Sequence, residues 1–479
     1  MSVFSNIFQE IIRENDISVS QLSKLIGMER TTIHKVISGT RTIKREQLDA
    51  LLKAMIITPH EKEELLKAYE IGKDGEDKFY QRLKVQKIIE SIAHLELVSF
   101  TKTPSAEKTP APDPEWPPSN VFRGEFAVNQ AISTVIRGEN DALYFSMPHN
   151  YPFFYDSLFT KYASCDNLSI NCFISFFKLK NKMKENLDVL DSIIPFLLSE
   201  KNKFQAYYVY TEASPSDIST LAFSYFIHTK SYTLFLSNKL DRAILAKSKP
   251  VTECYDTICA DFIKEAKPLL ARIETMENLI EMYGKSVTDD LGKFIDIFDQ
   301  PCLLIYFDMP LIRKYAVSTA ENIDILSDIF YEYTKTARSV FQNKQMSVFT
   351  QEGLNKFIET GIMTELPRFY IKPFDVEDRI KLLKYLLDDL VNDRIKFRLI
   401  NSSKFVIPRS FAISNYDGHS VLISDYNYEL GNVKALKIEE PFIVGAFYDF
   451  FDSIPDSNLI FSKDDTIQVI KDAIEKLES

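Results

Sequence analysis

The sequence predicts a multidomain protein in which an all-α N-terminal domain precedes a large mixed α/β body. Three observations support this organisation. Residues 1–71 hold short amphipathic segments, residues 101–120 contain six prolines, and strand-like and helix-like segments alternate from residue 121 onward. A proline-rich stretch forms neither helix nor central strand, so it marks a domain boundary, and the alternation favours α/β layers.

Two amphipathic segments meet at a glycine within residues 18–39. Gly27 can adopt the left-handed conformation that ends a helix and lets the chain turn, and Ser18 is placed to cap the first segment. The apolar positions follow the i, i+3, i+4 spacing of two short helices, namely Leu22, Leu25 and Ile26, then Ile33, Val36 and Ile37. This spacing is typical of a helix-turn-helix, whose second helix enters the DNA major groove.

The segment from about Phe4 to Tyr69 resembles the XRE (Cro and lambda-repressor-like) family of DNA-binding domains. Phe4–Glu14 is expected to be its first helix, Gly39 to end the recognition helix, and Thr58 with Pro59 to begin the fifth helix. Glu29 stands where the family usually has a small hydroxyl residue, and its carboxylate can still cap the recognition helix.

The resemblance implies a set of DNA contacts. Arg30, Thr31 and Lys35 fall where the family reads base edges, with Thr32 and His34 as secondary candidates. The residues expected near phosphates are Ser18, Lys24, Thr40, Arg41, Lys44 and Arg45.

The distribution of charged residues along the chain predicts that DNA contact is confined to the N-terminal domain. Residues 24–53 contain seven Lys/Arg and three Asp/Glu, whereas residues 1–70 contain ten of each. The whole chain has a net charge of −11, so residues beyond 70 carry the deficit. An acidic body is a poor general binder of nucleic acid, and we expect contact with double-stranded DNA through the N-terminal domain alone.

The domain boundaries follow from these features. Residues 72–77 predict a hinge, and the pattern from Lys78 to about Leu97 predicts a helix that either packs on its own head domain or forms a dimerising, signal-transmitting element. The predicted parts are a helix-turn-helix domain (1–71), a connecting helix (72–100), a Pro-rich linker (101–120) and two α/β lobes (121–283 and 284–479).

Runs of β-branched and aromatic residues predict the strands of the body. The predicted strands are 142–147, 168–176, 206–211, 232–236, 302–307, 368–372, 396–400, 411–414 and 420–424, and the predicted helices are 121–137, 152–163, 184–200, 252–283, 320–342, 375–394 and 464–477. A strand, a connection and an amphipathic helix recur in the same order at 231–262 and 419–451, which indicates two related lobes.

The five cysteines (165, 172, 254, 259 and 302) show no metal-ligand spacing, and we expect small core residues in a reducing cytoplasm. No apolar run reaches the roughly 18 residues of a membrane span, so no membrane partner is expected.

No catalytic constellation is recognisable, and neither an enzyme activity nor a cofactor nor a metal is expected. His228 and Lys230 form the H-x-K start of a phospholipase D-like motif, but Phe235 replaces its aspartate. His149 and Asn150 follow a predicted strand at a position where α/β layers often bind ligands.

The sequence therefore predicts a cytoplasmic, homodimeric, sequence-specific transcription regulator whose body senses a small-molecule or peptide effector or mediates assembly. Three alternatives stay open: a peptide-pheromone regulator with a helical-repeat body, a DNA-binding head fused to an unrecognised enzyme, and an architectural or phage-defence protein. The many strand-like runs argue against the helical-repeat body.

Overall fold

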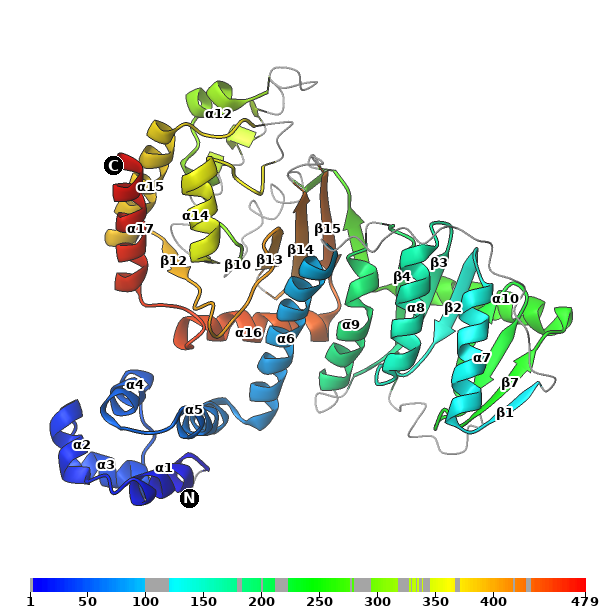
Figure 1. Cartoon of the computed structure of the whole chain (residues 1–479), viewed down its shortest axis with the longest axis horizontal. Helices are drawn as coiled ribbons and strands as arrows, with labels where there is room; N and C mark the ends of the chain where they lie inside the picture. Colours follow the sequence, from blue (N-terminus) through cyan, green and yellow to red (C-terminus); the bar gives the residue numbers. More distant parts are fainter. Residues whose placement is uncertain are drawn as a thin grey trace. The chain divides into compact units, whose positions relative to one another are not determined.

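The computed structural model divides the chain into two compact units, Met1–Leu83 and Lys84–Ser479. It describes residues 3–99, 120–178, 183–199, 201–211, 223–275, 294–317, 345–366, 371–416, 418–427 and 432–479, with a few further positions between 278 and 338. The Pro-rich segment predicted at 101–120 lies outside the described residues, apart from its last position. Figure 1 shows the elements of each unit.

The N-terminal unit is all α-helical, as the amphipathic spacing predicts. Its helices bury one apolar stripe each around a core centred on the fully buried Phe8 and Leu48. The helices are α1 (Val3–Glu14), α2 (Val19–Ile26), α3 (Arg30–Ile37), α4 (Arg45–Ala54) and α5 (Pro59–Asp74).

Local chemistry sets where these helices begin and end. Gly27 ends α2 with φ 65°, and Thr58 caps α5 by accepting a hydrogen bond from the Glu61 amide, so both predictions are confirmed. Ser18 and Glu29 occupy the N-cap positions of α2 and α3, but neither side chain makes the capping hydrogen bond that was expected. The Glu29 carboxylate instead accepts a hydrogen bond from the Thr31 hydroxyl at 3.3 Å.

The junction between α5 and α6 (Glu76–Ser99) is a single glycine. α5 runs through Gly72 to Asp74, so the turn predicted over residues 72–77 is confined to Gly75, whose φ of 91° favours glycine. Helix α6 confirms the helix predicted from Lys78. Its apolar residues Val85, Ile88, Ile89 and Ile92 are buried in the core of the body, which excludes packing on the head domain as their role.

Lobe 1 of the body is built on an eight-stranded sheet with the order β1-β7-β6-β5-β2-β3-β4-β8. β2, β3 and β4 are parallel to one another, and the remaining neighbours pair antiparallel. The strands are β1 (Val121–Arg123), β2 (Ala142–Ser146), β3 (Ser169–Phe177), β4 (Phe204–Thr211), β5 (Tyr225–Thr229), β6 (Thr233–Leu236), β7 (Arg242–Ala246) and β8 (Lys267–Pro268).

The two faces of this sheet are covered differently. Leu143 and Phe145 of β2 point to the face packed by α7 (Glu125–Gly138), α8 (Pro152–Ser164) and α9 (Met183–Leu197), which lie in front of the strands in Figure 1. The opposite face carries Tyr144 and is met by α10 (Lys249–Glu265).

Lobe 2 is built on a seven-stranded sheet with the order β12-β11-β10-β13-β14-β15-β9. Its strands are β9 (Leu270–Ile273), β10 (Phe294–Ile297), β11 (Gln345–Phe349), β12 (Lys396–Leu399), β13 (Phe411–Tyr416), β14 (Ser420–Asn427) and β15 (Asn432–Ile438). Its described helices include α12 (Met309–Tyr315), α14 (Gln351–Thr360), α15 (Val376–Val391), α16 (Pro441–Ser453) and α17 (Lys463–Glu478).

The two sheets share one topology. β4-β3-β2-β5-β6-β7 in lobe 1 corresponds strand for strand to β12-β11-β10-β13-β14-β15 in lobe 2. In both series the first three strands are parallel to one another. β6 with α10 then corresponds to β14 with α16, which are the segments whose similarity the sequence indicated. The fold is therefore a helical domain followed by a mixed α/β body whose two sheets share one strand order.

The lobes are joined more closely than the predicted boundary at residues 283 and 284 implies. β8 pairs with β4 in the first sheet, and β9, only one residue further on, pairs with β15 in the second. Side chains of α6, lobe 1 and α16 also belong to one hydrophobic core.

Several predicted elements differ from the structure. The helix expected over 252–283 ends at Glu265, because the chain becomes the edge strands β8 and β9. The strand expected at 302–307 contains a 3₁₀ turn (Leu304–Tyr306), and the helix expected at 121–137 begins with strand β1. The predicted segments 320–342 and 368–372 lie largely outside the described residues. Among the described helices, none is long and apolar enough to cross a membrane.

Candidate functional site

The surface of α3 presents the residues predicted to read base edges. Ile33 and Val36 are buried and fix α3 against the domain core. The opposite side of the helix exposes Arg30, Thr31, His34 and Lys35, whereas Thr32 is half-buried and accepts a hydrogen bond from Arg41 at 3.3 Å. The helix therefore displays a polar, basic face to solvent.

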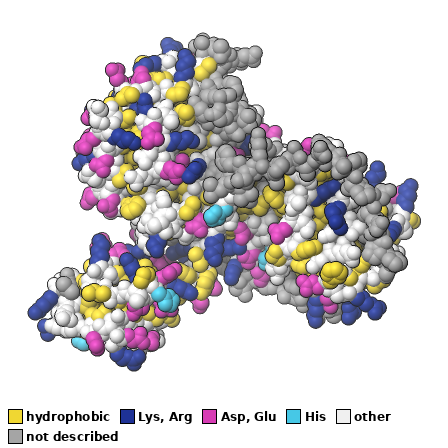
Figure 2. Space-filling view, in the orientation of Figure 1, with side chains coloured by type: hydrophobic (Ala, Val, Ile, Leu, Met, Phe, Trp, Pro, Cys, Tyr) yellow, Lys and Arg dark blue, Asp and Glu magenta, His cyan; other side chains and the backbone are white. Residues whose placement is uncertain are grey.

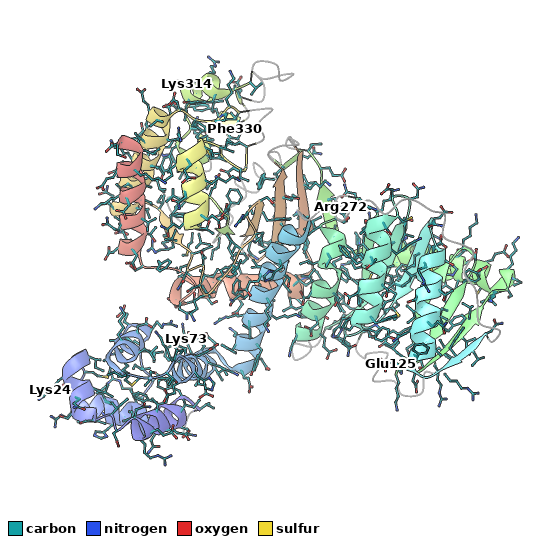
Figure 3. The ribbon with its side chains drawn as sticks, in the orientation of Figure 1. Lys24, Lys73, Glu125, Arg272, Lys314 and Phe330 are labelled. Atoms are coloured by element: carbon teal, nitrogen blue, oxygen red, sulfur yellow. The ribbon has the colours of Figure 1, made fainter. Side chains whose placement is uncertain are left out.

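Most of the residues predicted near phosphates are exposed as well, and two of them, Thr40 and Arg41, form hydrogen bonds with α3. Ser18, Lys24, Thr40, Arg41 and Lys44 are all exposed. Lys24 lies on the outer side of the unit in Figure 3, and Figure 2 shows Lys and Arg side chains on its visible surface.

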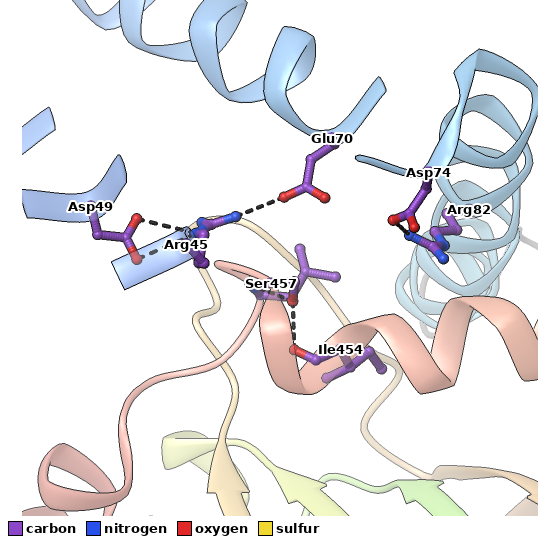
Figure 4. Close-up of polar contacts among 8 residues, drawn as sticks. Arg45, Asp49, Glu70, Asp74, Arg82, Ile454 and Ser457 are labelled. Carbon is purple, nitrogen blue, oxygen red and sulfur yellow. Dashed lines mark hydrogen bonds and ion pairs between the residues drawn. The ribbon is translucent and has the colours of Figure 1, made fainter. Parts of the chain in front are cut away.

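Arg45 has a different environment from the other basic residues. Its Nε lies 3.2 Å from Asp49 Oδ1 and its Nη1 lies 2.7 Å from Glu70 Oε1, with the Arg45 side chain only 19% exposed (Figure 4). The guanidinium thus ties α4 to α5, and burial raises the pKa of Glu70 although Arg45 opposes that shift. This arrangement favours a structural role over the expected phosphate contact.

A second candidate site lies in lobe 1, at the carboxyl ends of β2 and β3. The structure places a cavity of about 700 Å³ here, and both His149 and Asn150 line it. The volume is in the range of pockets that hold small ligands. Strand-end reasoning located these two residues, but it missed the other walls, which come from α7, α9 and the turn between β6 and β7.

His149 also lies beside a charged cluster that anchors α6. Its Nε2 is 3.9 Å from Asp188 Oδ2, and Asp188 Oδ1 is 2.7 Å from Nζ of Lys84 on α6. Lys84 Nζ also pairs with Asp191 at 2.7 Å. Burial lowers the pKa of His149 more than Asp188 raises it, which favours a neutral ring at neutral pH.

The H-x-K segment has a structural arrangement. His228 is fully buried on β5, where its Nδ1 lies 2.8 Å from the Thr233 hydroxyl and its Nε2 lies 3.0 Å from Asp256 of α10. Both ring nitrogens are therefore engaged, while Lys230 is exposed at the following turn. The pair links α10 to the sheet.

The cysteines agree only in part with the expected core role. Cys172 and Cys259 are buried, Cys165 and Cys302 are half-buried, and Cys254 is exposed. Burial raises the pKa of Cys259 to about 12, so its thiol is a poor nucleophile at neutral pH. Within the described ranges, no three His, Cys, Asp or Glu side chains are grouped to hold a metal ion.

Comparison with known proteins bears mainly on the N-terminal unit. Residues 8–66 match the family model described as a Cro/C1-type HTH DNA-binding domain. No curated protein matches the chain.

The solved structures that are similar to the chain include two at 10% identity. Phosphatidylserine synthase of Haemophilus influenzae Rd KW20 matches with a TM-score of 0.27, over 75% of this chain and 91% of its own. TrmBL2, an archaeal chromatin protein, matches with a TM-score of 0.22, over 53% of this chain and 99% of its own.

The helical order, the glycine turn, the exposed face of α3 and the family match agree with one another. The N-terminal domain of this chain is a helix-turn-helix of the Cro/C1 type, the XRE-like class that its sequence resembles.

Proposed function

We propose that this protein is a sequence-specific transcription regulator that binds a paired operator as a homodimer and responds to an effector bound by its α/β body. The main support for this proposal is the surface of α3. Its buried residues Ile33 and Val36 anchor the helix in the domain core, and its opposite side exposes Arg30, Thr31, His34 and Lys35. In a helix-turn-helix, residues near the start of the second helix contact base edges. An arginine placed there can bind guanine bidentately, which contributes about 1–3 kcal/mol of discrimination.

The small size of this face supports a homodimer. A single α3 is eight residues long and offers few base contacts, whereas regulators of this class gain specificity by engaging two half-sites about one helical turn apart. We therefore expect the operator to be a palindrome and the protein to occupy it as a pair of chains.

The test is genome-wide DNA capture with the purified full-length protein. The variant Arg30→Ala/Lys35→Ala removes two exposed cations from α3. A matched control, Arg13→Ala/Lys62→Ala, removes two exposed cations from α1 and α5. We expect a discrete palindromic site that the α3 variant loses and the control keeps. Weak binding without sequence preference, equal in all three proteins, would contradict the proposal.

A relay from body to head is supported by the continuity of α6. The helix begins at Glu76 and runs past the boundary between the units at Leu83 and Lys84. At its start, Arg82 Nη1 lies 2.6 Å from Asp74 Oδ2 across the Gly75 turn (Figure 4). Further along, Val85 and Ile92 are buried in the body. A ligand that binds one arrangement of this helix better than another shifts the equilibrium between them.

The relay has its own test, the operator affinity of Gly75→Ala. A side chain at φ 91° is strained, so the substitution shifts the junction without any contact to DNA. We expect weaker binding to the palindrome and unchanged binding to a single half-site. Equal losses on both DNAs would mean that the junction does not set the spacing of the two heads.

A further inference from the structure

The strand ends of lobe 2 that correspond to the lobe 1 cavity are covered by α14. The corresponding strand ends carry Asp299, which follows β10, and Thr350, which follows β11. The Thr350 hydroxyl donates a hydrogen bond to Asp299 Oδ1 at 2.5 Å. A Cβ on Gly353 in the first turn of α14 would lie 2.0 Å from the Asp299 carbonyl oxygen. Helix α14 therefore packs directly on this strand end, whereas the corresponding strand ends of lobe 1 line a cavity.

The charges around the cavity are mainly negative. Three carboxylates line it, from Glu125, Glu185 and Asp241, against one ammonium group from Lys239. His149 does not offset them, because burial lowers the pKa of its ring.

The carboxylates also occupy the helix ends that would otherwise attract an anion. Glu125 and Glu185 stand in the first turns of α7 and α9, whose N-terminal amides carry partial positive charge. Figure 3 shows Glu125 at this end of α7. A negatively charged ligand would face these carboxylates, whereas a positively charged one would be attracted.

Aromatic rings supply the rest of the wall. The cavity is lined by Tyr151, Tyr155, Phe173, Phe177 and Tyr225. Ring faces attract cations, most strongly when water is excluded. The same rings offer apolar area for an organic substituent, which a bare metal ion or a small inorganic cation cannot use.

We propose that the lobe 1 cavity binds an organic cation, with its ammonium group toward Glu125, Glu185 and Asp241 and its carbon skeleton against the aromatic wall. The binding stands by itself, and only its role as the effector rests on the proposed function. His149 then links the occupied cavity to Asp188, and Asp188 to Lys84 on α6.

The test compares three probes of similar shape and different charge on the purified full-length protein. Choline carries a positive charge, 3,3-dimethyl-1-butanol is its neutral isostere, and 3,3-dimethylbutanoate is an anion of similar size. Ligand-observed NMR titrations measure each affinity. We expect saturable choline binding, roughly tenfold weaker binding of the neutral isostere and no binding of the anion. Equal affinity for choline and its isostere, or no saturable choline binding, overturns the proposal.

Variants locate the site. Glu185→Gln keeps the size of a wall residue and removes its charge, and Glu125→Gln does the same at an exposed position. Glu265→Gln at the end of α10 is the matched control. Both cavity variants should lose at least severalfold in choline affinity while the control does not. Unchanged choline affinity in both would place the binding elsewhere and overturn the assignment.

Binding and regulation are separable in this design. Operator affinity is measured on the same samples with and without choline. If choline binds but leaves operator affinity unchanged, the cation site is supported and its proposed role as the effector site is refuted. If the protein has no operator but still binds choline selectively, the proposed regulator function is refuted and the cation site is supported.

Discussion

Replacing Lys84 with methionine should weaken the attachment of α6 to the body, while both the helix and the body stay folded. Lys84 Nζ lies 2.7 Å from both Asp188 and Asp191, and its side chain is only 18% exposed. Its removal leaves two carboxylates, 24% and 30% exposed, without their shared counterion. The pKa of Lys84 is raised by these partners against burial, so the ammonium form and its ion pairs persist throughout the neutral range.

The size of the effect follows from these contacts. A hydrogen bond to a charged group that is largely withdrawn from water contributes about 1.5–3 kcal/mol. Four apolar side chains of α6 (Val85, Ile88, Ile89 and Ile92) remain buried, and each contributes about 1.5–3 kcal/mol. The helix should therefore stay docked while its opening free energy falls by about 1.5–3 kcal/mol, which corresponds to a roughly ten- to hundredfold larger population of the open state.

Native-state hydrogen exchange of the peptide that covers α6 measures this opening. Lys87→Met is the matched control, because Lys87 lies on the same helix and is exposed. Amides of residues 85–93 should exchange roughly ten- to a hundredfold faster in Lys84→Met and at the normal rate in Lys87→Met. Equal exchange in the two variants would show that the Asp188–Asp191 pair does not hold the helix, and the relay argument would fail with it.

Three further perturbations test other parts of the structure. Burial raises the pKa of Asp299 to about 6 from 3.8, so folding stability falls as pH rises through this window, by at most about 3 kcal/mol. The thermal unfolding temperature of Asp299→Asn should therefore match that of the wild type below pH 4 and exceed it at pH 7. A constant difference between the two temperatures at all pH values would contradict this. Gly353→Ala should destabilise lobe 2 by about 1–3 kcal/mol or more in denaturant unfolding, because its Cβ would overlap the Asp299 carbonyl; an unchanged midpoint would show that α14 shifts freely. Arg82→Met should speed proteolysis at the α5–α6 junction by weakening its link to Asp74 by about 1 kcal/mol, with unchanged cleavage contradicting that role.

The helical domain could be predicted closely because its signals are local. The i, i+3, i+4 spacing, Gly27 and Thr58 each act within one or two turns of helix, so these signals can be recognised directly in the sequence. The side-chain caps at Ser18 and Glu29 were predicted wrongly, since a capping rotamer competes with other hydrogen bonds such as that from Thr31.

The body was predicted less completely because its determinants are distant in sequence. β8 and β9 follow a long amphipathic pattern, and only pairing with β4 and β15 makes them strands. Of the cavity walls, the strand-end rule finds His149 and Asn150, whereas Glu125, Glu185 and Asp241 come together only when three separate segments fold. Lys84 likewise gains its partners from a helix about a hundred residues away.

The strand pair β8 and β9 has a consequence for how the chain is synthesised. The helical head is synthesised before the body and forms a compact unit of its own. β9 is synthesised directly after the strands of the first sheet, whereas its partner β15 (Asn432–Ile438) follows much later in the chain. Until β15 arrives, the edge of β9 is an exposed row of backbone donors and acceptors, which is the kind of surface that aggregates or recruits chaperones. A truncated product would therefore carry a folded DNA-binding head on an incomplete body, and in the cell its removal would depend on recognition of that unpaired edge.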